Sequence, residues 1–197
     1  MELFFDVETT GLPTRGAPCF DLNAYKDARI VSIAWVLRSK HEILSSCYRI
    51  IRQADTHSDS EPLGGSYIHG INRSITQKFG KDLTSVLKEF LLDVALSDKI
   101  VAHNMDFDSS VVGSELYRQG FDPSQFLNHK RHCTMKSTTD LVKKTFKNST
   151  AYKWPKLSEL YDFCFHEQMK DAHNALADVE NTIKCYYFVR DNVVNLA

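Results

Sequence analysis

Three short stretches of the sequence combine carboxylates with other polar residues at the ends of apolar runs. They are residues 6–11, 103–108 and 173–178 of a chain of 197 residues. Because Asp and Glu are common and usually solvated, any one of these stretches alone would be a weak signal. Together they supply enough oxygen ligands for two divalent cations. The combination therefore points to metal-dependent chemistry on a phosphodiester.

A phosphodiester is anionic and reacts slowly, so its hydrolysis needs charge neutralisation and a hydroxide made near neutral pH. Two cations about 3.5–4 Å apart meet both needs, one by activating the attacking water and the other by stabilising the leaving oxygen. Magnesium prefers oxygen ligands and keeps several waters, so a few carboxylates suffice. We expect two Mg²⁺ ions, for which Mn²⁺ can substitute, with the ligands Asp6, Glu8, Asp108 and Asp178.

The attacking water also needs a base, and histidine, with an ordinary pKa of about 6.5, suits neutral pH. His173 precedes Asp178 by five residues, a separation that does not align on one helix face. We therefore expect His173 in a mobile entry loop, ordered only when substrate and metals are bound. Asp106 competes with Asp108 for the second stretch, since two residues apart they cannot point the same way on a helix. His103 is expected to be a structural residue at a strand end.

Hydrophobic patterning predicts the elements that position these residues. Residues 3–7 form an apolar run before a Thr-Thr-Gly-Leu-Pro turn, which predicts a buried strand with Asp6 and Glu8 on one face. Residues 99–103 predict another strand, followed directly by a helix with Asp108 in its first turn. Further predicted elements are an antiparallel hairpin of residues 30–37 and 43–51, a short strand at 131–135, a loop with a short helix at 66–79, and helices at 83–91, 136–146, 156–165 and 175–189.

This order of elements favours an α/β sheet with helices on its faces over an all-β fold or a helix bundle. In such sheets, functional sites lie outside the carboxyl ends of strands, where Asp6, Glu8 and Asp108 are expected. Residues 1–197 contain no repeat, low-complexity tract or convincing linker, so we predict a single domain, in keeping with 43% hydrophobic and 25% charged residues.

Neither a membrane span nor a secretory signal is expected, because the sequence lacks a run of about 18 apolar residues and starts with the acidic pair Met1-Glu2. The five cysteines are an odd number without a Cys-x-x-Cys pair, which favours reduced thiols over a zinc or redox site. We therefore predict an intracellular protein, in the cytoplasm or nucleus, that begins near Met1 and has no membrane partner.

Charge is distributed unevenly, although the formal net charge is only −1. Residues 130–156 contain eight Lys or Arg and a single acid, Asp140. Such a segment suits contacts with a nucleic-acid backbone, with a solvated basic helix and loop as the alternative. Tyr152 and Trp154 are interleaved with the lysines and either stack on bases or pack in a loop. The substrate contacts that we expect from this segment are Lys143, Lys144, Lys147 and Trp154.

The three stretches read Asp-x-Glu-Thr-Thr-Gly, His-Asn-x-x-Phe-Asp and His-x-Ala-x-x-Asp. In this order they resemble the three exonuclease motifs of the DEDD superfamily. The tyrosine branch of that superfamily has Tyr four residues before the last Asp, whereas this chain has Asn at 174 and His at 173. It therefore resembles the histidine branch, called DEDDh or DnaQ-like. The resemblance runs from Leu3 to about Ile183 and includes the stretches at residues 68–71 and 156–160.

The resemblance implies a ribonuclease H-like fold, with a mixed five-stranded sheet flanked by helices, and 3′→5′ removal of nucleoside 5′-monophosphates. It implies that the four carboxylates named above bind the metals and that His173 is the general base. It also favours Asp108 over Asp106, because Phe-Asp is part of the second motif. The substrate contacts that it implies are Thr9, Thr10, Leu12, Pro13, Ile71 and Asn104.

Three functions remain open at this point. The first is a stand-alone trimming or repair exonuclease on DNA, RNA or both, with single strands or exposed 3′ ends as substrates. The second is a proofreading-type subunit docked on a polymerase, which the short stretch of fewer than twenty residues after Asp178 disfavours. The third, a silent nucleic-acid-binding module, is disfavoured because all the carboxylates and His173 are present. A homodimer is possible in each case, with residues 130–156 as the shared basic surface.

Overall fold

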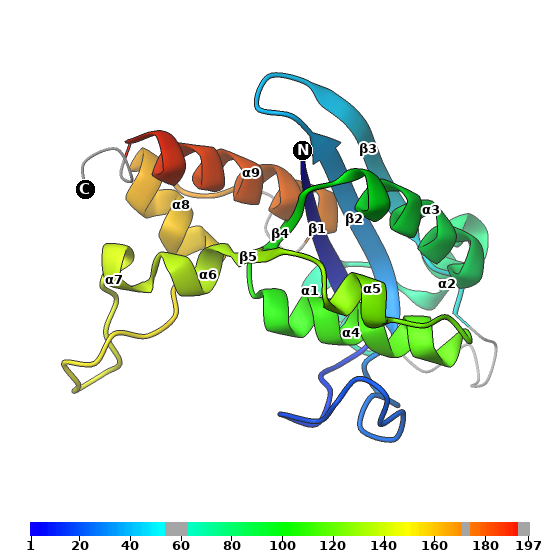
Figure 1. Cartoon of the computed structure of the whole chain (residues 1–197). Helices are drawn as coiled ribbons and strands as arrows, with labels where there is room; N and C mark the ends of the chain where they lie inside the picture. The colour runs from blue at the N-terminus through cyan, green and yellow to red at the C-terminus, as the bar shows by residue number, and fades with distance from the viewer. Residues whose placement is uncertain (54–62, 171–173, 193–197) are drawn as a thin grey trace.

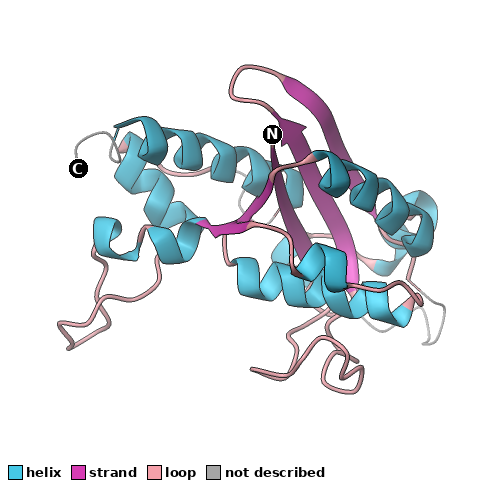
Figure 2. Ribbon diagram, viewed as in Figure 1, coloured by secondary structure: helices cyan, strands magenta, loops and turns pink. Residues whose placement is uncertain are grey.

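A mixed five-stranded sheet with helices on both faces forms the centre of the protein (Figures 1 and 2). The computed structural model describes residues 1–53, 63–170 and 174–192. The strands of the sheet are β1 (Glu2–Thr9), β2 (Ile30–Arg38), β3 (Ile43–Ile50), β4 (Lys99–Ala102) and β5 (Arg131–Cys133). The described helices are α1 (Ser66–His69), α2 (Arg73–Phe79), α3 (Leu83–Leu96), α4 (Met105–Arg118), α5 (Ser124–Leu127), α6 (Thr134–Ser137), α7 (Thr139–Val142), α8 (Leu157–Phe165) and α9 (Ala175–Asn192).

The strand order is β3-β2-β1-β4-β5, which places β1 at the centre of the sheet. β1 pairs antiparallel with β2 and parallel with β4, while β2 and β3 form the predicted antiparallel hairpin. β4 pairs parallel with the short edge strand β5. The predicted mixed sheet of five strands is therefore confirmed, and β1 continues past the carboxyl end of β4.

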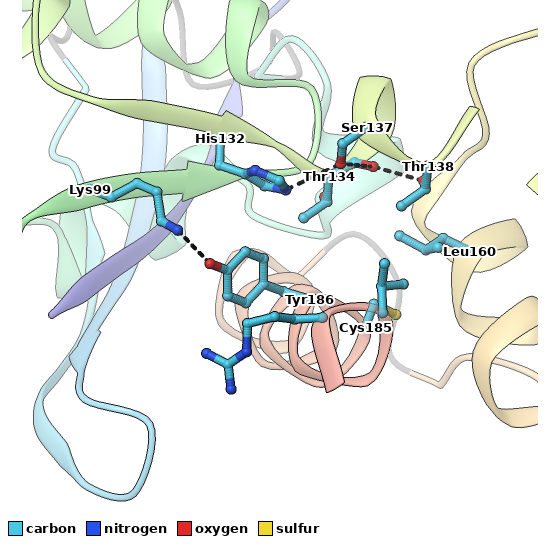
Figure 3. A pocket seen from close by; sticks show the side chains of 10 residues that line it. Lys99, His132, Thr134, Ser137, Thr138, Leu160, Cys185 and Tyr186 are labelled. Atoms are coloured by element: carbon cyan, nitrogen blue, oxygen red, sulfur yellow. Dashed lines mark hydrogen bonds between the residues drawn. The ribbon is translucent and has the colours of Figure 1, made fainter. Parts of the chain in front are cut away.

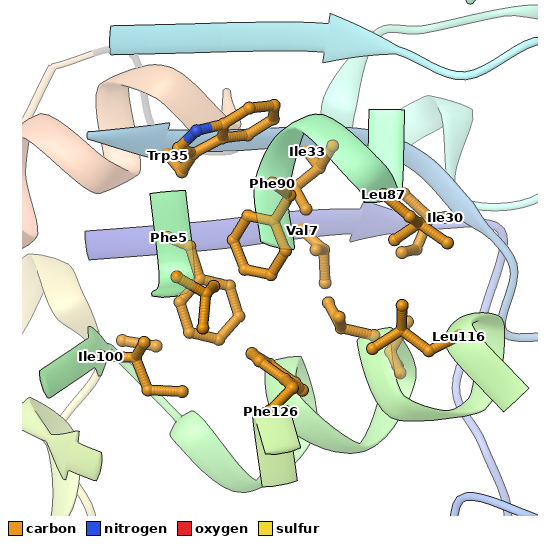
Figure 4. Packing of buried hydrophobic residues seen from close by; sticks show 14 of the residues in the cluster. Phe5, Val7, Ile30, Ile33, Trp35, Leu87, Phe90, Ile100, Leu116 and Phe126 are labelled. Carbon is orange, nitrogen blue, oxygen red and sulfur yellow. The ribbon is translucent and has the colours of Figure 1, made fainter. Parts of the chain in front are cut away.

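Aromatic residues from β1, β2, α3 and α5 fill the core on one face of the sheet (Figure 4). The ring of Phe90 lies 5.5 Å from those of Phe5 and Trp35 and 5.7 Å from that of Phe126. All four side chains are at most 1% exposed. Burial of such a side chain stabilises a fold by about 1.5–3 kcal/mol, so these contacts fix α3, α4 and α5 against the sheet.

The opposite face of the sheet is covered by α9. Its buried residues Ala175, Val179 and Ile183 recur every four positions and pack on Phe4 and Ala34. Farther along the helix, Tyr186 makes an edge contact with the ring of Phe4 at 5.2 Å. Since side chains alternate along a strand, Phe4 and Phe5 serve the two different cores. The result is that α9 runs along β1 with its first turn at the carboxyl end of that strand.

One predicted helix is wrong, because residues 136–146 do not form a single helix. α6 and α7 are separated at Thr138, whose hydroxyl donates to the Thr134 carbonyl at 2.7 Å. α7 then ends at Lys143, which has a left-handed conformation with φ of 53°. Threonine hydroxyls compete with helical backbone hydrogen bonds, which explains the break within this Ser/Thr-rich stretch. Residues 143–156 instead form an extended arm, drawn in yellow in Figure 1.

All five cysteines have free thiols. None of the described helices is both long and apolar enough to cross a membrane.

Candidate active site

β1 delivers the first two carboxylates at its carboxyl end. Asp6 and Glu8 lie on the same face of the strand as Phe4, because side chains alternate. This is the face that α9 covers, so both carboxylates point toward the start of α9. Oxygen atoms of Asp6, Glu8 and Asp178 lie within 4.8 Å of one another.

Asp108 reaches the same place from α4, on the other side of β1. The strand β4 ends at Ala102, and Asn104, with a left-handed φ of 81°, turns the chain into α4. β1 extends beyond the last residue paired with β4, so the Val7 amide faces this gap. A carboxylate oxygen of Asp108 accepts a hydrogen bond from that amide at 3.4 Å. Asp108 is 2% exposed. Its carboxylate thus gives the Val7 amide the hydrogen-bond acceptor that a neighbouring strand would otherwise supply.

Asp178 lies in the first turn of α9, and Asn174 positions that turn. The Asn174 side-chain oxygen accepts from the amides of Leu176 and Ala177 at 3.1 and 3.2 Å. Its carbonyl accepts from the Asp178 amide at 2.9 Å. Asn174 is thus an N-cap. We did not predict this role from the sequence, although an Asn directly before a helical pattern is a signal for it.

Burial and neighbouring carboxylates raise the pKa values of Asp6, Glu8 and Asp108. Burial and, after it, the charges of Asp108, Asp178 and Glu8 raise the pKa of Asp6 well above its ordinary value. Burial likewise raises the pKa of Asp108, with further contributions from Glu8 and Asp178. Burial and Asp178 raise the pKa of Glu8 to about 7. Of the three neighbouring charges, that of Asp108 raises the pKa of Asp6 most, followed by Asp178 and Glu8.

Such a cluster fits divalent cations. Like charges held together with little access to water are unfavourable unless they are neutralised by protons or by a counterion. Every donor in the cluster is a carboxylate oxygen, the ligand type that Mg²⁺ and Mn²⁺ prefer. The chemistry of the donor set is therefore that of a hard-cation site formed by Asp6, Glu8, Asp108 and Asp178.

The alternative carboxylate of the second stretch lies outside this cluster. Asp106 is exposed and forms an ion pair with Lys136 at 2.5 Å. His103 has a structural environment, as expected, because its Nδ1 lies 3.0 Å from the Thr134 hydroxyl and its Nε2 lies 3.0 Å from the Pro155 carbonyl. Burial lowers the pKa of His103 to about 4, so the imidazole is neutral at physiological pH.

His173, the predicted general base, lies outside the described residues, so its role stays a prediction. Asn174 follows it directly and begins the first turn of α9. Because Asn174 is fixed at the start of that helix, the chain at position 174 is held close to Asp178.

Two adjoining cavities surround the carboxylates. One of about 360 Å³ contains Asp6, Glu8, Asp108 and Asp178. The other, of about 580 Å³, lies between the turn after β1 and the first half of α4. The residues shared by the two cavities are Asn104, Phe107 and Trp154. The predicted contacts Asn104 and Trp154 thus lie where the acidic cavity opens into the larger groove.

The turn after β1 contains four predicted substrate contacts. The Thr9 hydroxyl donates to the Gly11 carbonyl at 2.7 Å, and the Thr10 hydroxyl donates to the Asp27 carbonyl at 2.7 Å. These two hydroxyls hold the turn in place. Leu12 is 79% exposed and lines the larger groove together with Pro13.

Ile71, which was predicted to contact the substrate, is largely buried, and that role stays a prediction. Ile71 is 6% exposed and packs with Val31 and Leu63, because it follows the turn that ends α1 and points into the interior. The exposed apolar residues of this region are Tyr67 and Ile68, at 89% and 46%, which we did not single out from the sequence. The glycines at 64 and 65 allow the chain before α1 to pack closely against the backbone at the end of β1. This Gly-Gly pair was the signal in the sequence that α1 lies beside the site.

The predicted contacts in the basic segment all lie on or beside the arm. Lys143, Lys144 and Lys147 are exposed. Trp154 is 55% exposed and lies at the base of the arm, where it lines both cavities.

Comparison with known proteins identifies the family. Residues 3–186 match the family model RNase_T, which is described as "Exonuclease". The chain belongs to this exonuclease family. The resemblance to DnaQ-like exonucleases is thereby confirmed. A search of curated protein sequences gave no match.

Solved structures of the exonuclease fold are similar over nearly the whole chain. E. coli exonuclease I in complex with a dA16 oligonucleotide has a TM-score of 0.74 and 19% identity, covering 99% of this chain and 42% of that chain. The zinc-bound form of the E. coli ExoI–ssDNA complex has a TM-score of 0.74 and 19% identity, covering 99% and 41%. A product-bound structure of exonuclease I has a TM-score of 0.73 and 19% identity, covering 99% and 44%. The chain thus spans about two fifths of these proteins and shares their ribonuclease H-like fold.

The raised pKa values predict that the metal-free protein loses stability as pH rises. Glu8 binds protons more tightly in the folded state, with a pKa of about 7 against an ordinary 4.5, and Asp6 and Asp108 shift in the same direction. Stability from these groups is therefore present at low pH and is lost as pH rises through about 7. We expect the Tm in EDTA to fall between pH values of about 5 and 8, and Mg²⁺ to raise it more at the higher pH.

Calorimetry of two variants tests the cause. Glu8→Gln should raise the Tm in EDTA at alkaline pH and flatten its pH dependence, because it removes one of the repelling charges. Glu42→Gln, at an exposed position in the β2–β3 turn, is the matched control and should change neither. A metal-free Tm that rises over the same pH range would contradict the cluster's electrostatics.

Proposed function

We propose that this exonuclease-family chain removes nucleoside 5′-monophosphates from the 3′ ends of single-stranded DNA, RNA or both, with two Mg²⁺ ions as cofactors. Mn²⁺ is the expected substitute. The observation that carries the proposal is the convergence of Asp6, Glu8 and Asp178 within 4.8 Å, with Asp108 buried beside them, in a chain that matches the exonuclease family.

Asp6 has the central place in this proposal. Its carboxylate lies within 4.8 Å of those of Glu8 and Asp178, and Asp108 is the neighbouring charge that raises its pKa most, so it would hold metal together with all three. Glu8 and Asp178 on one side of it and Asp108 on the other would complete the two ligand sets. Bound cations would neutralise the scissile phosphate, activate the attacking water and stabilise the leaving oxygen.

His173 is proposed as the base that accepts the proton from the attacking water. It immediately precedes Asn174, which caps α9, so a base at this position would reach the carboxylates from the start of the helix that carries Asp178. A loop position allows it to approach after the substrate has entered, which suits a group that must contact the reacting water.

The two adjoining cavities suggest how the 3′ end lies. The acidic cavity would hold the scissile phosphate, and the larger groove would hold the terminal nucleotides between Leu12-Pro13 and Trp154. Leu12 is 79% exposed and Trp154 is 55% exposed, so both offer apolar surface to a base. Stacking of this kind accepts any base, as an exonuclease without sequence preference requires.

The arm of residues 143–156 would hold the strand farther from its end. The arm contains no acidic residue, and Lys143, Lys144 and Lys147 are exposed along it. Phe146 and Tyr152 are 56% and 43% exposed, so aromatic rings are interleaved with cations as in single-strand binding surfaces. The two sides of the arm are joined by a hydrogen bond from the Lys153 amide to the Lys144 carbonyl at 2.8 Å.

Three contacts fix the base of the arm beside the acidic cavity. The neutral His103 donates from Nε2 to the Pro155 carbonyl at 3.0 Å, and Lys153 pairs with Glu159 at 2.8 Å. The ammonium of Lys136 lies over the Trp154 ring at 5.5 Å. A strand bound along the arm would therefore be directed to the carboxylates rather than held at random.

Single-stranded DNA is the first substrate to test, since solved structures of E. coli exonuclease I contain single-stranded oligonucleotides. The presence of all four carboxylates in one cluster argues against a silent binding module. Nothing among the described residues favours a polymerase-docked subunit over the stand-alone enzyme.

The first prediction is a metal-dependent 3′ ladder. With 5′-labelled single-stranded DNA or RNA of one sequence and Mg²⁺, gel electrophoresis should show products shortened stepwise from the 3′ end. EDTA or Asp6→Ala should abolish them, and circular dichroism should show that the variant is folded. Shortening from the 5′ end, internal cuts, or activity retained in Asp6→Ala would each refute the proposal, and the relative DNA and RNA rates decide the substrate class.

The second prediction separates the two carboxylates of α4. Asp108→Asn should lower the rate of the exonuclease reaction by about a hundredfold or more, because the variant removes a buried ligand charge. Asp106→Asn is its matched control and should retain most activity, because Asp106 is exposed and paired with Lys136. If initial-rate measurements showed a larger loss for Asp106→Asn than for Asp108→Asn, the second motif would be misplaced and Asp106 would be its functional carboxylate.

The third prediction concerns the arm. In the absence of divalent metal, replacing Lys143, Lys144 and Lys147 by Ala should weaken the binding of single-stranded DNA or RNA. The slope of log Kd against log salt concentration should fall by up to about 2, because each lost phosphate contact lowers it by about 0.7. The control replaces three exposed lysines away from the arm, Lys78 in α2, Lys81 between α2 and α3, and Lys88 in α3. If fluorescence-anisotropy titrations gave equal salt slopes for both triple variants, the lysines of the arm would be solvated surface residues and not contacts to the nucleic acid.

A further inference from the structure

The connection between β1 and β2 forms one wall of the larger groove. Residues 10–29, all of which the structure describes, contain no helix or strand. Residues 12–17 and Tyr25 line the groove from this side, and the first half of α4 lines it from the other. A long connection without regular structure needs fixed contacts if it is to hold a ligand in one geometry. The contacts that hold it therefore determine the shape of the groove.

The two ends of this connection are fastened to each other. The Thr10 amide donates to the Arg29 carbonyl at 2.9 Å, and the Arg29 amide donates to the Thr10 hydroxyl at 3.0 Å. The same hydroxyl donates to the Asp27 carbonyl at 2.7 Å. Gly11 lies so close to Asp27 that an added Cβ would be 2.8 Å from the Asp27 carbonyl oxygen. The backbone directly before Leu12 is thus fixed to Arg29 and its neighbours.

Glu115 in α4 binds the side chain of Arg29. Its carboxylate oxygens lie 2.6 Å from Arg29 Nε and 3.2 Å from Arg29 Nη2. The same carboxylate accepts from the Ile30 amide at 3.4 Å and lies 3.3 Å from Arg118 Nε. Arg118 also donates to the Tyr25 carbonyl at 3.3 Å. Glu115 is 0% exposed, so a buried carboxylate joins α4 to the end of the β1–β2 connection and to the start of β2.

An ion pair of this kind contributes geometry more than stability. A buried carboxylate loses its hydration, and the attraction of its partners roughly offsets that loss, so well-packed apolar residues often stabilise a fold equally well. The guanidinium of Arg29 instead meets Glu115 with two of its nitrogens, which fixes both distance and direction. The end of the connection is thereby held in one orientation relative to α4.

The helix α4 relates this ion pair to the carboxylate cluster. Glu115 follows Asp108 by seven residues, about two helical turns, so the two carboxylates lie on the same buried face of the helix. Val111 and Val112 lie between them and Leu116 follows them, all 0% exposed in the core, so α4 is held in place independently of either carboxylate. One rigid helix thus carries a predicted metal ligand and the anchor of the groove wall.

We propose that the Arg29–Glu115 ion pair is a positioning pair that sets the groove wall for the 3′ end of a strand. It holds Leu12 and Pro13 at a fixed distance from the acidic cavity, so that the terminal nucleotides enter in register with the carboxylates. Neither Arg29 nor Glu115 lines the acidic cavity or the groove as the described residues define them, so the pair acts through the wall and not by contact with substrate. This inference rests on the proposed exonuclease function.

Steady-state kinetics on 5′-labelled single-stranded DNA test the pair. The double variant Arg29→Met, Glu115→Leu leaves no unpaired buried carboxylate, so its Tm should stay close to that of the wild type. Its KM should rise by about tenfold or more, because small displacements of a positioning element have effects of this size. Because the carboxylate cluster is unchanged, kcat and the Mg²⁺ concentration for half-maximal rate should stay within about twofold. Arg29→Lys keeps the charge but loses the two-point contact, so its KM should rise less.

Tyr186→Phe is the matched control. It removes the hydrogen bond that Lys99 donates to the Tyr186 hydroxyl at 2.5 Å, a partly buried contact between β4 and α9 (Figure 3). Lys99 is the first residue of β4, so this contact lies at the end of the sheet away from the groove. Tyr186→Phe should leave KM unchanged, although it also loses a hydrogen bond between two elements.

The outcomes separate this inference from the proposed function. If the folded wild-type protein does not hydrolyse the strand, the exonuclease function is refuted, and the Kd of the strand without divalent metal, measured by fluorescence anisotropy, tests the pair in the same variants. Hydrolysis with an unchanged KM in the double variant overturns the positioning role. An equal rise of KM in Tyr186→Phe, or a lower kcat with a raised Mg²⁺ requirement and unchanged KM, also overturns it. If the double variant does not fold, the KM of Arg29→Lys decides in the same way.

Discussion

Four carboxylates are held close together at the end of the central strand, where they repel one another. Burial and neighbouring charges raise the pKa values of Asp6, Glu8 and Asp108, so without protons or a counterion the cluster opposes folding. The protein offsets this cost with two aromatic and aliphatic cores that hold the supporting elements in place. Instability at the cluster and affinity for divalent cations then have the same origin.

The central strand makes this arrangement possible. Phe4 and Phe5 are adjacent in the chain but serve opposite cores, so α9 and α4 approach β1 from different faces. β4 ends early, and Asp108 occupies the free edge of β1 by accepting from the Val7 amide. Asn174 caps the start of α9 and so fixes the first turn, which contains Asp178. The site is therefore formed by the ends of three elements whose positions are set by packing far from the carboxylates.

The predicted substrate contacts lie on different parts of the chain from the carboxylates. Leu12 and Trp154 lie on loops at the two sides of a groove, and the basic arm is joined to the site through His103 and Pro155. Loops can present exposed apolar and cationic groups without disturbing the cores, whereas the carboxylates need rigid elements.

The family and the five strands could be predicted from the sequence, because alternating and helical periodicities are local properties of the chain. The candidate metal ligands could be predicted as well, because each lies beside a recognisable element boundary. These ligands are Asp6, Glu8, Asp108 and Asp178. Local patterns failed where hydroxyls or tertiary packing compete with them. Thr138 and Lys143 break the helix expected at 136–146, and Ile71 turns into the interior beside Val31. Tertiary structure alone decided that Asp106 pairs with Lys136 while Asp108 fills the free edge of β1, since that edge exists only once β4 has paired and ended.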